Sequence, residues 1–81
     1  MNHRIDRMLK PGSRIGILGG GQLGRMLAVA ASRLGFTSHI FDPNVNSPAS
    51  QVTCKTLTAS YEDKRALIKF ANSVDIITYE F

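Results

Sequence analysis

A run of three glycines, Gly19 to Gly21, separates a short apolar segment from one with helical periodicity, and this arrangement leaves few folds open. Residues 19–24 fit the pattern G-x-G-x-x-G, which carries information where it follows a strand and opens a helix. In that setting Gly19 permits the tight turn, Gly21 lets a ligand approach the backbone, and Gly24 lets the helix pack closely on the strand. The first N–H groups of the helix then attract anionic or polar ligand atoms. We therefore predict a ligand-binding turn; the alternative is a tight turn without a ligand.

The segments on either side of the glycines alternate between strand and helix patterns. Short apolar or β-branched runs predict strands over residues 14–18, 37–41, 55–59 and 74–79. Apolar residues at helical spacing predict helices over 22–34 and from Ser60 to about residue 73, with Ser60 and Asp63 as a capping box. Helices between successive strands specify parallel βαβ crossovers. The chain is therefore predicted to be α/β, a Rossmann-like parallel sheet that ends after about four strands.

The last predicted strand and the glycine turn are expected to meet at one edge of the sheet. In the usual doubly wound order, the strand over 74–79 lies beside the strand over 14–18, on the side away from the second strand. Ligands of such sheets bind at the carboxyl ends of the strands that flank this point, where Gly19 and the carboxylate of Glu80 arrive. A carboxylate there would repel a diphosphate, whereas it accepts hydrogen bonds from ribose hydroxyls or from an amine.

Asp42 ends the second predicted strand and precedes Pro43. An NAD-binding domain places its ribose-binding carboxylate at about this point, so Asp42 is a candidate ribose contact. On that basis an NAD(P)-binding Rossmann segment of an oxidoreductase is one interpretation of the chain. Asp-Pro after a strand is also a common plain turn, and the residues alone leave both roles of Asp42 open.

The formal charge of +4 is concentrated at the N-terminus, so it does not predict a nucleic-acid partner. Four basic residues and one acidic residue lie within residues 1–14. We therefore expect a disordered basic leader over 1–13 and a domain over 14–81. Cys54 is the only cysteine, which excludes an intrachain disulfide and fits a reducing cytoplasm. The longest apolar run, residues 26–31, is too short to predict contact with a membrane interior.

The motifs of this domain resemble those at the start of the 5-(carboxyamino)imidazole ribonucleotide synthases, the ATPase subunits of phosphoribosylaminoimidazole carboxylase. The resemblance extends from about Arg14 to Phe81 and lies in the runs Ile15–Leu27, Phe41-Asp42-Pro43, Ser47-Pro48-Ala49 and Asp75–Phe81. It implies an ATP-grasp ligase of bacterial de novo purine biosynthesis, of which residues 14–81 would be the pre-ATP-grasp domain. Such an enzyme uses ATP and bicarbonate to make carboxyphosphate, and then carboxylates the exocyclic amine of 5-aminoimidazole ribonucleotide.

The resemblance also implies roles for individual residues. The substrate contacts would be Gly21, Gln22, Leu23 and Glu80, while Gly19, Gly20 and Gly24 would shape the turn. No catalytic residue and no metal ligand is expected in this chain, because ATP, Mg²⁺ and the groups that clamp the substrate phosphate would lie in later domains. The parent enzyme would be a cytoplasmic homodimer. Since the chain ends at Phe81, before the ATP-grasp domain, we expect it to be inactive alone, and a non-catalytic interaction module is the third interpretation.

Overall fold

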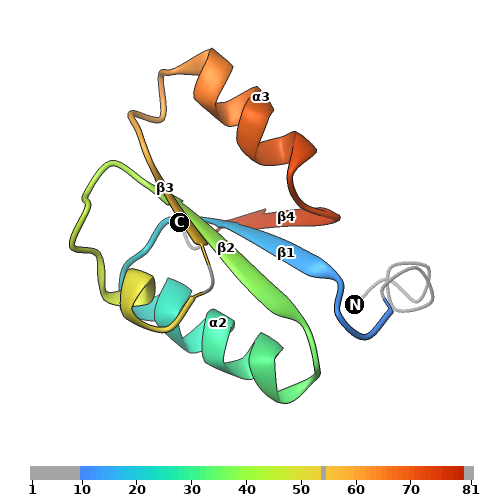
Figure 1. Ribbon diagram of the computed structural model, residues 1–81. Coiled ribbons are helices and arrows are strands. Elements are labelled where there is room, and N and C mark those ends of the chain that lie inside the picture. The colour runs from blue at the N-terminus through green and yellow to red at the C-terminus, as the bar shows by residue number, and fades with distance from the viewer. Residues whose placement is uncertain (1–9, 54, 80–81) are drawn as a thin grey trace.

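The computed structural model describes residues 10–53 and 55–79, which form a four-stranded sheet with helices on both faces (Figure 1). The elements in chain order are β1 (Arg14–Leu18), α2 (Gln22–Arg33), β2 (Thr37–Asp42), the 3-10 helix η1 (Pro48–Gln51), β3 (Lys55–Thr58), α3 (Lys64–Asn72) and β4 (Ile76–Tyr79). All strand pairs are parallel, and the strand order is β3-β2-β1-β4. The predicted α/β class is confirmed, as is the position of the last strand beside the first. None of the helices within the described ranges is long and apolar enough to cross a bilayer.

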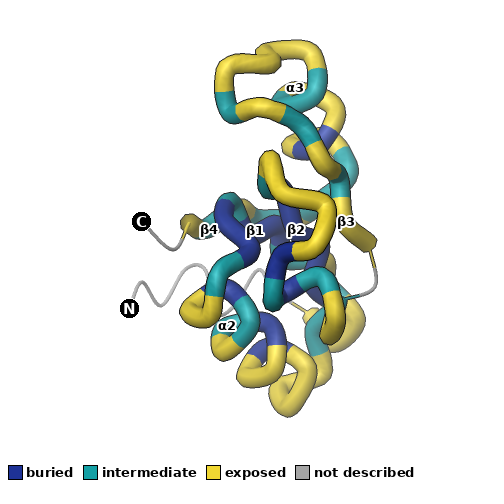
Figure 2. Tube along the Cα trace, turned by 90° about the vertical axis from the view of Figure 1, so that its left-hand side faces the viewer, coloured by how far each residue is buried: buried dark blue, intermediate teal, exposed yellow. Residues whose placement is uncertain are grey.

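One core lies between the sheet and the layer formed by α2 and η1. Ile17 of β1 and Ile40 of β2 pack there with Ala28 of α2 and Ala49 of η1, and these four side chains are 2% exposed or less. The small alanine side chains let α2 and η1 approach the strands closely. Figure 2 shows the buried residues concentrated in β1 and β2, the two central strands.

The opposite face of the sheet is covered by α3 through one aromatic side chain. Phe70 is the buried residue of α3, and its ring makes an edge-on contact with the ring of Phe41, with 5.4 Å between centroids. Gly16 of β1 makes room for this ring. A Cβ at position 16 would lie 2.8 Å from Phe70 Cε2 and 2.9 Å from Val74 Cγ2. A larger residue in the middle of β1 would therefore push α3 away from the sheet.

The helix ends confirm one predicted boundary and correct another. Gly35 ends α2 as expected, with a φ of 85° and an N–H that donates to Ser32 O at 3.0 Å. The capping box at Ser60 was wrong, because α3 begins at Lys64 and its N-cap is Asp63, whose Oδ1 accepts the Ala66 N–H at 3.1 Å. Ser60 instead belongs to the preceding turn. β4 begins at Ile76, later than the predicted start at residue 74.

Residues 10–13, which we assigned to the leader, form a turn in front of β1. The Ser13 N–H donates to Lys10 O at 2.9 Å, and the Lys10 N–H donates to Ser13 Oγ at 3.0 Å. Gly12 N–H donates to Gly35 O at 2.7 Å, which holds the turn against the end of α2. These residues are therefore an ordered part of the domain. Residues 1–9 lie outside the described ranges, and the expectation for them stays a prediction.

Candidate functional site

The glycine turn lies at the carboxyl end of β1, between β2 and β4. Leu18, the last residue of β1, is the register partner of Phe41 in β2 and of Tyr79 in β4. Gly19 then leaves the strand with a φ of 107°, a value that residues with a Cβ rarely adopt, and its N–H donates to Phe41 O at 2.8 Å. The turn therefore sits where the strand order reverses, which is the position that ligands of open parallel sheets occupy.

Asp42 braces this turn from the end of β2. Its Oδ2 accepts the Gly20 N–H at 2.7 Å and lies 3.5 Å from the Tyr61 hydroxyl, which donates to it. Its Oδ1 accepts the Asn44 N–H at 2.7 Å. Both carboxylate oxygens are thus engaged by the chain itself, which favours the turn role of Asp42 over the ribose contact. The ribose contact remains an untested prediction.

The loop after β2 supports the turn from a second side. Ser47 is 2% exposed, and its Cβ would lie 2.7 Å from a Cβ added at Gly20, so the Ser47 side chain leaves no space for a side chain at position 20. Ala49 N–H donates to Gly20 O at 2.8 Å. Gly20 is therefore fixed through its N–H, its carbonyl and its Cα, and the turn is a rigid part of the fold.

The start of α2 presents two exposed side chains beside the turn. Gly21 is the N-cap, with extended backbone, and Leu23 is 50% exposed. The neighbouring Gln22 is also exposed and, with Arg25 and Met26, lines an open hollow of ≈ 400 Å³ on the outer surface of α2. Gly24 is buried. Gly21, Gln22 and Leu23 thus lie at the N-cap and first turn of α2, and their contact with a substrate stays a prediction.

Glu80 lies outside the described residues, so its predicted contact with a substrate stays a prediction. In the sequence Glu80 directly follows Tyr79, as Gly19 follows Leu18, and Tyr79 and Leu18 are register partners. The side chain of Tyr79 is 64% exposed. The last described residues of β4 therefore lie next to the glycine turn, as the strand order required.

The ion pair of the described residues lies away from the glycine turn. Arg14 and Asp75 form an ion pair at 3.4 Å, at the opposite ends of β1 and β4 from the glycine turn. Within residues 10–53 and 55–79, no group of three or more His, Cys, Asp or Glu side chains is placed to hold a metal ion. Beside the turn, the described part of the site offers backbone, the amide of Gln22, the apolar surface of Leu23 and the guanidinium of Arg25, which donates to Gln51 Oε1 at 3.1 Å.

The sequence predicted the glycines but missed the residues that hold them. The bracing roles of Ser47, Ala49 and Tyr61 come from tertiary contacts, and the first two lie in a loop rich in Asn, Ser and Pro. The signal that was present is Pro48, which opens η1 and commonly occupies the first position of a helix. A helical turn at Pro48, soon after β2 ends at Asp42, is a reason to expect that the loop between them packs back on the sheet.

Residues 12–81 match the ribonucleotide synthetase preATP-grasp domain family. An N5-carboxyaminoimidazole ribonucleotide synthase from Brucella melitensis is 55% identical over 73 residues, which are 90% of this chain and 20% of the relative. A synthase of the same name from Bacillus subtilis is 48% identical over 75 residues, which are 93% of this chain and 20% of the relative.

Solved structures agree with these sequence matches. The N5-carboxyaminoimidazole synthetase of Staphylococcus aureus with ADP has a TM-score of 0.87 at 42% identity, covering 90% of this chain and 20% of that chain. The enzyme of Aspergillus clavatus in complex with ADP and 5-aminoimidazole ribonucleotide has a TM-score of 0.77 at 37% identity, covering 88% of this chain and 19% of that chain. The chain therefore spans about a fifth of the length of these relatives.

Proposed function

Because the chain belongs to the ribonucleotide synthetase preATP-grasp domain family, we propose that it is the substrate-binding N-terminal segment of an ATP-dependent ligase. The proposed parent enzyme carboxylates 5-aminoimidazole ribonucleotide with bicarbonate in de novo purine biosynthesis. The matched relatives carry the name of that synthase, and the Aspergillus clavatus structure contains the ribonucleotide. By itself the chain is proposed to bind substrate without turning it over.

The observation that carries the proposal is the rigid glycine turn at the boundary of β1 and β4. Gly20 is held through Asp42 and Ala49, and the turn leaves Gln22 and Leu23 exposed at its rim. A ligand can therefore approach the backbone closely there without first ordering the loop, which removes part of the entropy cost of binding. The segment that contains this turn is 55% identical to a named synthase.

In the proposed complex the turn holds the ring, amine or ribose of the substrate rather than its phosphate. Gln22 offers both a donor and an acceptor, and Leu23 offers apolar surface to a ring. The Glu80 carboxylate accepts a hydrogen bond from the exocyclic amine and orients the nitrogen for attack. The role of Glu80 is positioning, and no residue of this chain is proposed to be catalytic.

Further properties of the parent enzyme follow the same proposal. It would use ATP with Mg²⁺ to activate bicarbonate as carboxyphosphate, and the ADP in the Staphylococcus aureus and Aspergillus clavatus structures supports the use of ATP. The residues that hold ATP, Mg²⁺ and the substrate phosphate are proposed to lie outside these 81 residues. We also propose a homodimer in a bacterial cytoplasm.

The oxidoreductase alternative depends on Asp42 as a ribose-binding carboxylate. Both oxygens of Asp42 already accept backbone N–H groups, from Gly20 and Asn44, which counts against that role. No contact among the described residues favours the third interpretation, an interaction module, over the ligase segment.

The proposal is tested by titrating the nitrogen-15-labelled chain and following its amide signals. 5-Aminoimidazole ribonucleotide should shift the amides from Gly21 to Gly24, while NADH should leave those near Asp42 unchanged. Gln22→Ala and Glu80→Gln should weaken the ribonucleotide shifts, whereas Glu62→Gln, at an exposed acid outside the turn, should not. Shifts near Asp42 with NADH, and none at the turn with the ribonucleotide, would overturn the proposal.

The parent activity is tested in a chimera in which residues 12–81 replace the matching segment of the Bacillus subtilis synthase. We expect phosphate release from ATP that requires both bicarbonate and the ribonucleotide. The same chimera with Gln22→Ala should need a higher ribonucleotide concentration to reach half of its maximal rate of phosphate release. A folded chimera that releases phosphate equally well without the ribonucleotide would contradict the assignment of this segment to substrate binding.

A further inference from the structure

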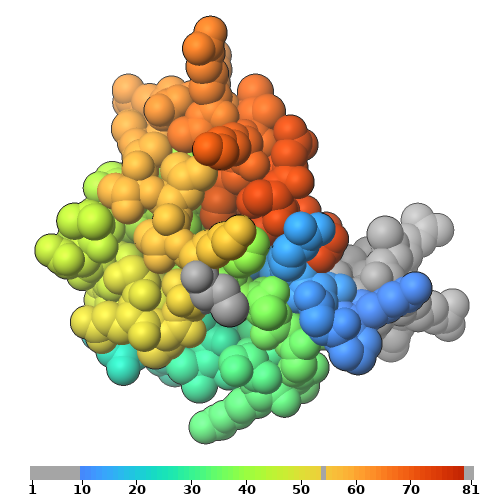
Figure 3. All heavy atoms as spheres, viewed as in Figure 1, coloured from blue at the N-terminus to red at the C-terminus, as the bar shows by residue number. Residues whose placement is uncertain are grey.

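A second pocket lies on the face of the sheet that α3 covers. It has a volume of ≈ 300 Å³ and is lined by His39 of β2, by Lys55, Thr56 and Leu57 of β3, and by Lys69, Phe70 and Ser73 on and after α3. In the space-filling view the amber atoms of the β3 region border the orange-red atoms of α3 on this surface (Figure 3). None of the lining residues belongs to the glycine turn, so the pocket is distinct from the site described above.

The pocket exists because α3 covers only part of its face of the sheet. Gly16, His39 and Lys55 are register partners across β1, β2 and β3, so they form one row on one face. At Gly16 the row has no side chain, and the Phe70 ring of α3 packs there. Above β2 and β3 the helix contributes no other buried residue, which leaves a hollow between Phe70 and the strands.

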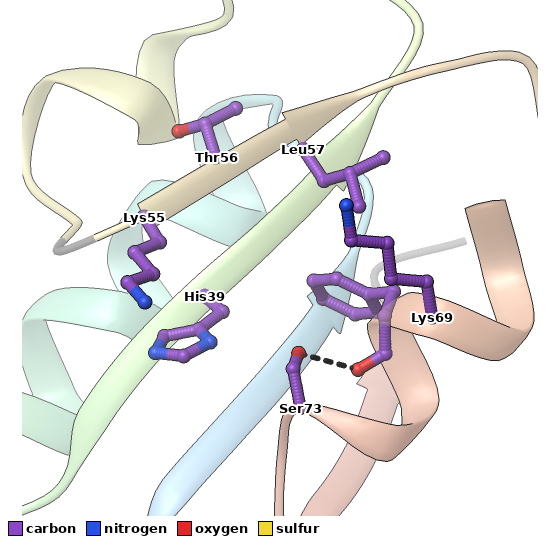
Figure 4. A pocket seen from close by; sticks show the side chains of 7 residues that line it. His39, Lys55, Thr56, Leu57, Lys69 and Ser73 are labelled. Atoms are coloured by element: carbon purple, nitrogen blue, oxygen red, sulfur yellow. Dashed lines mark hydrogen bonds between the residues drawn. The ribbon is translucent and has the colours of Figure 1, made fainter.

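The rim of this hollow is positively charged. Lys55 and Lys69 come from opposite sides of the pocket, one from the sheet and one from the helix, and no carboxylate of residues 10–53 or 55–79 lines it. Figure 4 shows the amine of Lys55 near the His39 ring and the amine of Lys69 near the Leu57 side chain. Among the described residues, the ion pair present joins Arg14 and Asp75, so neither lysine is paired with an acid there.

His39 adds a polar group that the fold leaves unused. Its side chain is 8% exposed, and its ring makes no hydrogen bond to another of the described residues. Burial, together with the charges of Lys55 and Arg14, lowers the pKa of His39, while Asp75 acts in the opposite direction. The imidazole is therefore neutral at pH 7, and it offers one donor and one acceptor toward the pocket.

We propose that this pocket binds a small organic phosphate, with the phosphate between Lys55 and Lys69 and an apolar ring against Leu57. Two ammonium groups match the charge of a phosphate monoester at neutral pH, about −1.5 to −2. Lysine binds phosphate as a point charge, which suits two flexible side chains that reach in from different elements. Leu57, which is partly exposed, gives the ring of the ligand an apolar surface next to the buried Phe70, and the volume is at the lower end for small-molecule sites.

The test uses phenyl phosphate as the probe. Inorganic phosphate and phenol, which each carry one part of the probe, are titrated separately as controls. Phenyl phosphate should shift the amide signals of His39, Lys55, Leu57 and Phe70, and should bind more tightly than either control. Because an anion favours the protonated imidazole, the pKa of His39 should rise when the probe is bound. Shifts only at the glycine turn, or equal affinity for inorganic phosphate, would overturn the proposal.

Variants separate this pocket from general attraction to a basic chain. Lys55→Gln and Lys69→Gln, both at exposed positions, should each weaken phenyl phosphate binding by about fivefold or more. Lys64→Gln removes the same charge from α3 at a position that does not line the pocket, and should leave the affinity unchanged. Equal weakening in all three variants would show that binding follows net charge and would overturn the site.

Discussion

The carboxylate of Asp42 accepts the Gly20 N–H at 2.7 Å, so the end of β2 fixes the shape of the glycine turn. The other oxygen of Asp42 accepts the Asn44 N–H at 2.7 Å and joins the turn to the loop after β2. A hydrogen bond to an ionised acceptor is stronger than one between neutral amides. Asp42 therefore shapes the turn for a ligand, whether or not its carboxylate contacts one.

Replacing Asp42 with alanine should destabilise the chain. The substitution leaves the Gly20 N–H without its acceptor, at an expected cost of about 1–3 kcal/mol in the free energy of unfolding. Urea unfolding measures this loss. Glu62→Ala removes an exposed acid and should change the stability by less than about 0.5 kcal/mol. An equal loss in both variants would mean that net charge, rather than the contact with Gly20, is responsible.

Gly20→Ala should be destabilising for a steric reason. The added methyl would lie 2.7 Å from Ser47 Cβ, and overpacking of this kind costs about 1–3 kcal/mol. Ser47→Gly removes the opposing group, so the double variant should recover part of the loss in a double-mutant cycle followed by urea unfolding. Additive losses from the two substitutions would show that Ser47 is not what excludes a side chain at position 20.

The strands and helices were predictable from the sequence because they depend on local patterns, and the place of β4 beside β1 followed from the usual order of doubly wound sheets. The run 14–18 is nearly all apolar, as expected for a strand with helices on both faces, and the helical periodicity after residue 21 requires a crossover. The glycine turn followed from its position between these two segments. The contact roles of Gln22 and Leu23 were implied by the resemblance, and the exposure of Leu23 was not predicted, because Leu23 belongs to the apolar periodicity of the helix.

The bracing of the turn was not predictable, because it depends on contacts between distant residues. Ser47 lies in a loop whose composition indicates exposure, yet it is 2% exposed, because Gly20 has no side chain and η1 packs beneath the turn. The start of α3 was misplaced for a local reason. Ser60 and Asp63 are both good N-cap residues, and the sequence alone did not decide between them.

Phe70 should be the residue of α3 on which the packing of that helix depends. Phe70→Ala removes the buried ring against Phe41 and should cost about 3–5 kcal/mol. Ile68→Ala is the matched control, because Ile68 belongs to the same helix but is 62% exposed, and it should cost less than about 0.5 kcal/mol. If Phe70→Ala does not fold, Phe70→Leu, which keeps an apolar side chain, is measured by urea unfolding instead. Its loss of unfolding free energy should be larger than that of Ile68→Ala and smaller than the roughly 3–5 kcal/mol expected for Phe70→Ala.

Asp75 should stabilise the chain at neutral pH and lose this effect in acid. Its Oδ2 accepts the Arg14 N–H at 2.6 Å, and this bond, followed by the Arg14 guanidinium, lowers the pKa of Asp75 below 3.8. The stabilisation is therefore complete above pH 3.8 and is lost as the pH falls through the folded pKa. Asp75→Asn should lower the Tm at pH 7 and lower it less at about pH 3. A Tm difference that is the same at both pH values would exclude the charge of Asp75 as its cause.

His39 should make the chain less stable as the pH falls below neutral. Burial first, and then Lys55 and Arg14, lower its pKa below 6.5, although Asp75 opposes them. Just below pH 6.5 the unfolded chain binds this proton and the folded chain does not, so the free energy of unfolding falls with the pH. The slope for one proton is at most about 1.4 kcal/mol per pH unit. In a His3→Gln background His39 is the only histidine. Adding His39→Gln should reduce the change of the urea midpoint with pH between about pH 7 and 5.5. An unchanged slope would assign the titration to another group.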